Sequence, residues 1–475
     1  MKQFDHLQKN FLLRCAKARL VTAHLPNSGA DGKNRIDDLE DNDSNWQRRV
    51  RRIAALSDGF ATSCAERYSA LIDPRTGPLG ADALSSAGLF LCGISACVDA
   101  LVEMHDIQPL LDAPADTPAA QLANLLLSRA ARGVGGEVRF DWPEGPAWLR
   151  ERLRPRYALG GTGPQAAWVL GQLGVRSVVA LEDRHAAMLR QIPAGVLLAE
   201  RGRLKTSDAV STAGRHIPEI FIFEFTAGRA IGAVVPPRSS RVIIRFCDRG
   251  IQRDKDFEAM SRRLAASAAA GLLSGLNDEA VENVGAASRH VFALSRDWKA
   301  AGLRTIHFEL AGYATQQAIE ELLSHTSGSI TSLGMSHSEL LAMNSSAHHP
   351  MEALVALGQR FDLERVCVHA DTWAAAVTLN DPMEEERALM AGCAIASARA
   401  ATGEPARTIA IAPTAEFHPL PFETPVRKGR WTFVACASPY VEKPATTLGL
   451  GDSFTAGCLL ILGRNRHADA SLQHA

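Results

Sequence analysis

From residue 88 onward, short apolar runs alternate with longer amphipathic stretches, and this alternation is the feature that most constrains the fold. The runs have the length of strands, and they lie at 88–94, 177–181, 217–225, 241–246, 271–276, 304–310, 329–335, 365–370 and 431–437. Helical periodicity is typical of the stretches between them, such as 257–269, 314–325 and 384–401. Strands that alternate with helices predict a mostly parallel sheet with helices on both faces. Ligands of such sheets bind outside the carboxyl ends of the strands, so polar residues that follow strands are the site candidates.

Two parts of the chain depart from this pattern. The segment 26–46 is polar and acidic, which indicates an exposed loop or linker, and residues 1–80 are therefore predicted to be an N-terminal extension. Residues 81–470 are predicted to form the main domain. Periodicity is mixed between about 100 and 160, and inserted segments at about 103–157 and 216–246 are predicted to build a smaller lid.

Bulk properties exclude several classes of protein. A chain of 475 residues is long enough for one large domain and an accessory one. Its 51 basic residues balance 52 acidic ones, which argues against a nucleic-acid partner. The nine cysteines are scattered without a CxxC pair, so reduced thiols are expected instead of a zinc site or a disulfide framework. No run of about 18 apolar residues occurs, and we expect a cytoplasmic protein with no membrane partner.

The most informative local motif lies near the C-terminal end, where Gly449, Leu450 and Gly451 precede Asp452 and an apolar stretch predicted to be a buried helix. Glycines before a helix allow a tight turn whose free N–H groups, together with the helix dipole, form an anion site. Such a site stabilises a phosphoryl group in transfer, and an adjacent carboxylate can accept the proton of an attacking hydroxyl. The alternative for Asp452 is a helix N-cap.

This motif and its context resemble the ribokinase-like kinases. The stretch from about 88 to 463 resembles, more specifically, the ADP-dependent glucokinase and phosphofructokinase family. Its landmarks occur in the family's order, and they include CGISACVDALV (92–102), LGGTGPQAAWVLGQLGV (159–175), IFIFEFTAG (220–228), IHFELAG (306–312), SLGMSHSELLAM (332–343), VCVHADTW (366–373) and TLGLGDSFTAG (447–457).

The resemblance implies both a fold and an activity. The implied fold is a ribokinase-like three-layer α/β/α sandwich with a mostly parallel central sheet and a smaller β-rich lid. The implied enzyme is a Mg²⁺-dependent kinase that transfers a phosphoryl group from ADP to a hydroxyl of a sugar or sugar phosphate. Asp452 is the general base of this reaction, and Gly449, Leu450 and Gly451 form the anion hole.

Two glutamates at successive predicted strand ends are candidates for holding the metal ion. Glu309 ends one strand, and Glu339 follows the next. Magnesium prefers oxygen ligands and takes one or two carboxylates together with waters and phosphate oxygens. The resemblance implies that Glu309 and Glu339 help to hold Mg²⁺, directly or through water, with Asp452 beside them. Glu339 could instead only favour the start of a helix. His307 and His369 are interpreted as core residues.

The acceptor is expected to bind near Asp99, which follows a buried strand and can accept hydrogen bonds from two sugar hydroxyls. The resemblance implies that Gly160, Gly161 and Thr162 line the same pocket. A helix cap is the alternative role for Asp99.

Several positions depart from the family pattern. Ser95 and Thr162 stand where sugar-phosphorylating relatives carry amide residues, Ile220 stands where a histidine is usual, and Ser336 replaces an asparagine. A pocket built to hydrogen-bond hydroxyls rejects ligands that lack them, so the loss of polar groups predicts a changed acceptor. Glucose is therefore not assigned.

The residues leave two other functions open. One is an ATP-dependent sugar or nucleoside kinase of the same fold, and the other is a catalytically weak regulatory protein that binds a sugar or nucleotide. Three arginines near the predicted lid either pair with a phosphate of the acceptor or are surface charges; they are Arg229, Arg238 and Arg241.

Overall fold

The protein is described by a computed structural model, which covers residues 58–214, 219–343 and 349–464. Contacts divide the chain into two compact units, Met1–Ser57 and Asp58–Ala475. The described residues all lie in the second unit. The predicted linker at 26–46 lies outside them.

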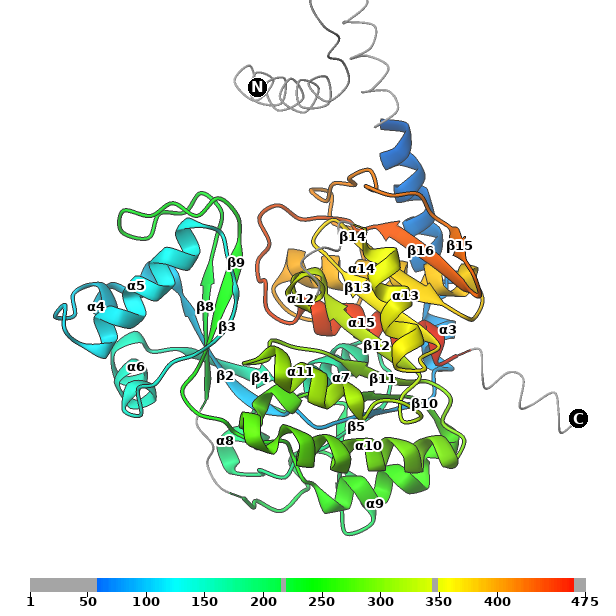
Figure 1. The fold of residues 1–475 in the computed structure, drawn as a ribbon, viewed down its shortest axis with the longest axis horizontal. Helices are drawn as coiled ribbons and strands as arrows, with labels where there is room; N and C mark the ends of the chain where they lie inside the picture. The colour runs from blue at the N-terminus through cyan, green and yellow to red at the C-terminus, as the bar shows by residue number, and fades with distance from the viewer. Residues whose placement is uncertain (1–57, 215–218, 344–348, 465–475) are drawn as a thin grey trace, which may run out of the picture. The chain divides into compact units, whose positions relative to one another are not determined.

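Eleven strands in the described part of the chain form one large sheet (Figure 1). They are β1 (Leu89–Cys92), β5 (Ser177–Val179), β6 (Val196–Glu200), β7 (Arg203–Lys205), β10 (Ala268–Leu273), β11 (Ile306–Glu309), β12 (Ser332–Ser336), β13 (Arg365–His369), β14 (Trp373–Thr378), β15 (Val426–Lys428) and β16 (Trp431–Ala437). Their order is β15-β16-β14-β13-β12-β11-β10-β1-β5-β6-β7. The strands from β13 to β6 run parallel, and the strands at both edges pair antiparallel. The carboxyl ends of β10 to β13 therefore meet at one edge.

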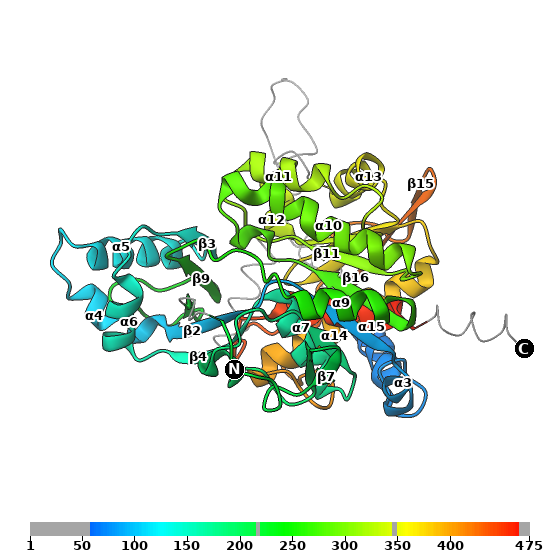
Figure 2. The ribbon, with the colours of Figure 1, turned by 90° about the horizontal axis from the view of Figure 1, so that it is seen from below.

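Helices cover both faces of this sheet (Figure 2). One face packs against α9 (Lys255–Leu264), α10 (Val284–Ala300), α11 (Gln316–Ser324), α12 (His337–Met343) and α13 (Pro350–Arg360). The other packs against residues 58–72, α3 (Ala81–Ser85), α7 (Thr162–Gln172), α8 (Ala186–Leu189), α14 (Pro382–Thr402) and α15 (Leu450–Leu462). Alternate side chains of one strand enter different cores, as Phe90 and Leu91 of β1 do. The predicted α/β class, with a mostly parallel central sheet between helical layers, is confirmed.

A second sheet of five strands, called the small sheet below, is inserted between elements of the large one. Its strands are β2 (Cys97–Glu103), β3 (Gly136–Arg139), β4 (Arg156–Gly160), β8 (Ile220–Phe225) and β9 (Ser240–Arg245), in the order β3-β9-β8-β2-β4. The helices α4 (Gln108–Leu111), α5 (Pro118–Ala131) and α6 (Gly145–Leu153) pack on it around a separate apolar core. The strands β2 and β4 extend beyond the predicted insert 103–157.

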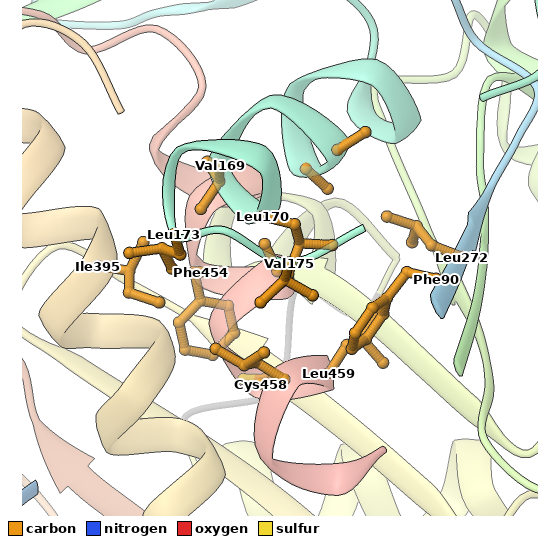
Figure 3. Packing of buried hydrophobic residues seen from close by; sticks show 14 of the residues in the cluster. Phe90, Val169, Leu170, Leu173, Val175, Leu272, Ile395, Phe454, Cys458 and Leu459 are labelled. Carbon is orange, nitrogen blue, oxygen red and sulfur yellow. The ribbon is translucent and has the colours of Figure 1, made fainter. Parts of the chain in front are cut away.

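Two largely buried helices, α14 and α15, touch at glycines. A Cβ atom added to Gly392 would lie 2.5 Å from the ring of Phe454, and one added to Gly457 would lie 2.7 Å from the carbonyl oxygen of Ala391. Interiors are close-packed, so neither position has room for a side chain. Figure 3 shows side chains of α15 among those of α7, α14 and the sheet; the labelled residues include Phe90, Leu170, Ile395, Cys458 and Leu459.

Some element boundaries differ from the sequence prediction. The helix predicted at 257–269 ends at Leu264, and β10 begins at Ala268. The strand predicted at 271–276 is the second half of β10 and ends at Leu273. The stretch Ala268–Ala270 has high helix propensity, but it lies in the middle of the sheet between β1 and β11, and tertiary packing overrides propensity there.

The segment before residue 81 contributes to the core. Tyr68 and Leu71 are buried, and the hydroxyl of Tyr68 donates a hydrogen bond of 2.7 Å to the carbonyl oxygen of Ala437 at the end of β16. The compact unit begins at Asp58, whereas the predicted main domain begins at residue 81.

No helix in the described ranges has the length and apolar character that crossing a membrane requires.

The glycine contact between α14 and α15 predicts an unusual response to alanine. Gly457→Ala should lower the free energy of unfolding by about 1–3 kcal/mol, although alanine favours helices, because the methyl group overpacks the contact. Gly171→Ala in α7 is the matched control, since its added Cβ would meet its nearest atoms at 3.6 Å. The control should be neutral or stabilising by up to about 1 kcal/mol. Equilibrium urea unfolding measures both, and equal effects of the two changes would contradict the packing argument.

Candidate active site

The turn that precedes α15 presents free backbone donors. Gly449 occupies the N-cap position with φ 69°, a conformation that favours glycine. Within the described residues, the N–H groups of Leu450 and Gly451 have no hydrogen-bond acceptor; the first helical bond runs from Ser453 N to the oxygen of Gly449. The first turn of a helix also carries the positive end of its dipole. The turn therefore has the donors and the field of an anion site.

Asp452 is the third residue of α15 and not its cap, because Gly449 is the N-cap. Burial raises the pKa of its carboxyl group, while the charge of Arg399 and a hydrogen bond with Thr162 act in the opposite direction. A carboxylate whose pKa is raised is a stronger base than one in water. Its place beside the free donors of Leu450 and Gly451 suits proton abstraction from a hydroxyl next to a bound anion.

The acceptor-side residues predicted from the sequence come together around Asp99 in β2. Gly160 ends β4 beside it, and a Cβ atom at Gly160 would clash with the Asp99 carboxylate. Gly161 has φ 90° and approaches the carbonyl oxygen of Ser95 so closely that a side chain would clash there. Thr162 then starts α7 and bonds with Asp452. This turn connects the predicted acceptor side with the predicted base.

The carboxyl group of Asp99 is only 5% exposed, and burial raises its pKa to about 7. The negative charge of Asp452 acts in the same direction, whereas a hydrogen bond from Cys97 and the charge of Arg249 oppose the shift. Ile220 of β8 is its register partner on the neighbouring strand. Asp99 is thus a desolvated carboxyl group with an apolar neighbour.

Glu309 ends β11, and its side chain lies on the face of the sheet that α15 covers. Its Oε2 accepts hydrogen bonds of 2.7 Å from His307 Nε2 and 3.1 Å from Thr455 Oγ1. His369 Nε2 lies 3.6 Å from Oε1. Burial alone would raise the pKa of Glu309, but the bonds from His307 and His369 outweigh it and lower the pKa to about 2. Glu309 is therefore an anion at any physiological pH.

A series of buried hydrogen bonds continues from Glu309 through His307 into the core. His307 Nδ1 bonds with Ser332 Oγ at 2.7 Å, and Ser332 Oγ accepts a bond of 3.1 Å from Arg365 Nη1. Arg365 is paired with Glu385 of α14 at 2.8 Å. These bonds fix the ring of His307 and thereby the direction of the Glu309 carboxylate.

Glu339 and Ser336 form a capping box at the start of α12. The backbone N–H of Ser336 donates to Glu339 Oε2 at 2.7 Å, and the N–H of Glu339 donates to Ser336 Oγ at 3.3 Å. Burial raises the pKa of Glu339, and the charge of Glu309 adds to the shift. Glu339 therefore does stabilise the start of a helix, as the alternative role predicted from the sequence required. Its Oε1 takes no part in the capping box.

The carboxylates of Glu309 and Glu339 are the candidate ligands of a magnesium ion. In the described ranges, no group of three or more His, Cys, Asp and Glu side chains is arranged to hold a metal ion. Magnesium needs only one or two protein carboxylates when waters and phosphates complete its shell. Oε2 of Glu309 already has two donors, which favours contact through a metal-bound water. Glu309 and Glu339 repel each other, and a divalent cation between them would relieve this repulsion. These two carboxylates therefore fit a magnesium ion.

His369, interpreted as a core residue from the sequence, lies at the edge of the site. Its side chain is 21% exposed, and its ring is tilted against that of Phe454 with 5.1 Å between the centroids. It also lies close to Gly451. Burial would lower the pKa of His369, but the neighbouring carboxylates of Glu309 and Glu339 raise it. His369 is therefore a neighbour of the anion turn whose protonated form the two carboxylates favour.

The small sheet contacts the same turn. Glu224 of β8 accepts hydrogen bonds of 2.8 Å from both the N–H and the hydroxyl of Thr447, and Arg241 of β9 donates one of 2.7 Å to the Thr447 carbonyl. Arg238 pairs with Asp371 after β13 at 3.1 Å, with both side chains largely exposed. The small sheet thus reaches the segment that leads into α15.

The comparison with known families decides the membership of the chain. Residues 90–461 match the ADP-specific phosphofructokinase/glucokinase conserved region. The chain belongs to this family. It is accordingly a phosphotransferase of the ADP-dependent sugar kinase class, and the matched region contains the sheet, the small sheet and α15 through Ile461.

Solved structures share the fold. A hypothetical ADP-dependent phosphofructokinase from Pyrococcus horikoshii OT3 is 18% identical, with a TM-score of 0.63, and covers 80% of this chain and 99% of its own. An ADP-dependent kinase in complex with fructose-6-phosphate and ADPβS is 16% identical, with a TM-score of 0.66, covering 84% and 98%. No curated protein sequence matches the chain. The predicted α/β fold of this family is confirmed.

The structure brings the predicted residues into one electrostatic group. The charge of Asp452 raises the pKa of Asp99, and the charge of Glu309 acts on both Asp452 and Glu339. Sequence reasoning missed Arg399 of α14, which donates hydrogen bonds to the anion turn. An arginine inside the alanine-rich, nearly all-apolar stretch 388–401 was the available signal, because a buried cation needs a specific partner.

The raised pKa of Asp99 predicts a pH-dependent stability. A carboxyl group with a native pKa of about 7 and an ordinary value of 3.8 stabilises the fold fully below pH 3.8, and this contribution is lost as the pH rises through 7. Asp99→Asn does not titrate. The difference in unfolding free energy between Asp99→Asn and the parent protein should therefore increase between about pH 5 and pH 8, by on the order of 2 kcal/mol. Urea unfolding at both pH values measures it, and a constant difference would contradict the buried environment of Asp99.

Proposed function

We propose that the protein is a Mg²⁺-dependent kinase that transfers a phosphoryl group from ADP to a hydroxyl of a sugar or sugar phosphate, with Asp452 as the general base. The observation that carries this proposal is the position of Asp452, which lies beside the free N–H groups of Leu450 and Gly451 and is hydrogen-bonded to Thr162. The base, the anion donors and the acceptor turn thus meet at the start of one helix.

The proposed reaction follows from this arrangement. The acceptor hydroxyl lies between Asp99 and Asp452. Its oxygen forms a bond to the β-phosphorus of ADP, the bond from that phosphorus to the bridging oxygen breaks, and AMP leaves with the electron pair. The hydroxyl proton passes to Asp452, whose raised pKa suits it to accept one. The N–H groups of Leu450 and Gly451 bind the phosphoryl oxygens where negative charge is greatest.

Glu309 and Glu339 are the residues that we propose for holding magnesium, with Asp452 nearby. When bound, the cation neutralises the charge of the nucleotide phosphates. Glu309 is kept anionic by His307 and His369, and the capping box fixes Glu339. Both carboxylates are therefore held in fixed positions before any cation or nucleotide binds.

The acceptor side favours a sugar phosphate over glucose. Ile220 is the register partner of Asp99, and Ser95 Oγ is already bonded to Ser274 Oγ at 2.9 Å, so neither supplies a free polar group for a hydroxyl. Two nitrogens of Arg249, whose charge acts on Asp99, are buried without a partner, as is Nε of Arg241. Unpaired guanidinium atoms are suited to a phosphate group.

We propose that the small sheet serves as the lid of this site, as the predicted segments 103–157 and 216–246 suggest. Its contacts through Glu224, Arg238 and Arg241 support this role, because each joins the small sheet to a loop at the carboxyl edge of the large one. A lid that closes here would exclude water from the phosphoryl transfer. We place the enzyme in the cytoplasm, where its free cysteines stay reduced.

The variant Asp452→Asn tests the proposed role of Asp452. The change keeps the size of the side chain but removes the proton acceptor, so kcat should fall by about 10²–10⁴. The affinity for ADP should change little, because the N–H donors of the turn remain. Steady-state rates, with an acceptor first identified by a thermal-shift screen of sugars and sugar phosphates with Mg²⁺ and ADP, measure the first quantity. Calorimetry measures the second.

The control for this experiment is Asp248→Asn, which removes a carboxylate that is paired with Arg139 on the small sheet. It should leave kcat within about twofold of the parent value, because a partly exposed ion pair contributes little. Equal rates for the parent protein and Asp452→Asn would contradict the general-base role.

A further inference from the structure

Arg399 of α14 is a buried cation without a carboxylate partner among the described residues. The residue is 2% exposed, and its Nε has no hydrogen-bond partner. Burial lowers the pKa of its guanidinium group to about 10, so it remains charged at neutral pH. A buried unpaired charge costs several kcal/mol of folding free energy, and proteins keep such groups paired with a counter-charge or a ligand. The charges of Asp452 and Asp99 act on Arg399 and offset its burial only in part, so an anion bound at the neighbouring turn would complete its pairing.

The guanidinium group of Arg399 contacts the turn before α15, the first residues of α15 and a ring of α7. Nη1 donates to the carbonyl oxygen of Gly449 at 3.2 Å and to Ser453 Oγ at 3.3 Å. The guanidinium packs so closely against Gly449 that a Cβ atom there would clash with it. Trp168 of α7 lies 5.6 Å from its Cζ, with its ring facing the cation. Three elements thus hold the guanidinium group against the turn.

The contact with Gly449 also orients the neighbouring peptide. In a trans peptide unit the carbonyl oxygen and the following N–H point in opposite directions. Because Arg399 and Ser453 hold the oxygen of Gly449, the N–H of Leu450 on the other side of the peptide is directed away from the helix and stays free to bind an anion. Arg399 therefore fixes a donor in addition to contributing a positive charge.

We propose that Arg399 is a positioning residue that holds the Gly449–Leu450 peptide and serves as the buried counter-charge for the phosphate bound at the α15 turn. This proposal rests on the proposed function, since it assigns the anion to the donor nucleotide. It also explains why the position before Leu450 must be glycine, because no other residue fits against the guanidinium group. The interaction becomes complete only when the nucleotide is bound.

The test compares nucleotide and phosphate affinity in the parent protein and three single variants. Arg399→Met removes the charge and both hydrogen bonds, and Arg399→Lys keeps the charge. Arg387→Met removes an equal charge from an exposed position of the same helix and is the matched control. Calorimetry measures the dissociation constants of Mg-ADP and of inorganic phosphate at two salt concentrations, and thermal unfolding checks the fold of each variant.

We expect Arg399→Met to weaken binding of both ligands by about tenfold or more, as the loss of a charge-assisted contact predicts. Arg399→Lys should recover most of the affinity, and Arg387→Met should leave it unchanged. A folded Arg399→Met protein that binds both ligands as tightly as the parent protein would overturn the proposal. So would an equal loss in Arg387→Met, since that would indicate an effect of net charge alone.

A second variant keeps the proposal testable if Arg399→Met does not fold. Ser453→Ala leaves the buried charge in place but removes one of its two anchors, and it should weaken phosphate binding by about threefold or more. Unchanged affinity in Ser453→Ala would contradict the positioning role. Binding does not depend on turnover, so a protein that binds Mg-ADP through Arg399 but transfers no phosphoryl group would refute the proposed function and not this inference.

Discussion

The position of the active residues depends on the glycine contact between α14 and α15. Because Gly392 and Gly457 let two buried helices touch, α14 and α15 pack closely, and Thr455 in α15 donates a hydrogen bond to Glu309 at the carboxyl end of β11. The same contact brings Arg399 of α14 beneath Gly449. A shift of α15 would move the base and the anion donors away from Arg399 of α14, so the packing of the two helices determines the geometry of the chemistry.

The site is an assembly of carboxylates whose charges act on each other. Burial raises the pKa values of Asp99, Glu339 and Asp452, while the two histidines at Glu309 keep that residue ionised. Like charges in a desolvated site are unfavourable unless cations balance them. The protein supplies the guanidinium group of Arg399, and a magnesium ion would supply further positive charge. Nucleotide binding and the stability of this cluster are therefore linked.

The sequence was informative where periodicity and chemistry agreed. The strands β11, β12 and β13 could be predicted because their sequences are short apolar runs. Asp452 could be predicted because two glycines before it indicate a turn. The strand β14, Trp373–Thr378, was missed because its three consecutive alanines have no strand propensity, and only pairing with β13 and β16 makes it extended. The role of Arg399 could not be predicted, because its partner lies 50 residues away along the chain. Capping by Glu339 was foreseen only as a favourable helix start.

The central claim is that the terminal phosphoryl group of ADP is transferred to a sugar hydroxyl at the turn before α15. Phosphorus NMR of the protein with Mg²⁺, ADP and a panel of sugars and sugar phosphates tests it most directly, because it resolves ADP, AMP and new phosphomonoesters in one sample. The account predicts that AMP and one sugar phosphomonoester appear in equal amounts, and that ATP in place of ADP supports little transfer. Phosphomonoester formation from ATP but not from ADP, or AMP formation without a phosphorylated sugar, would contradict it.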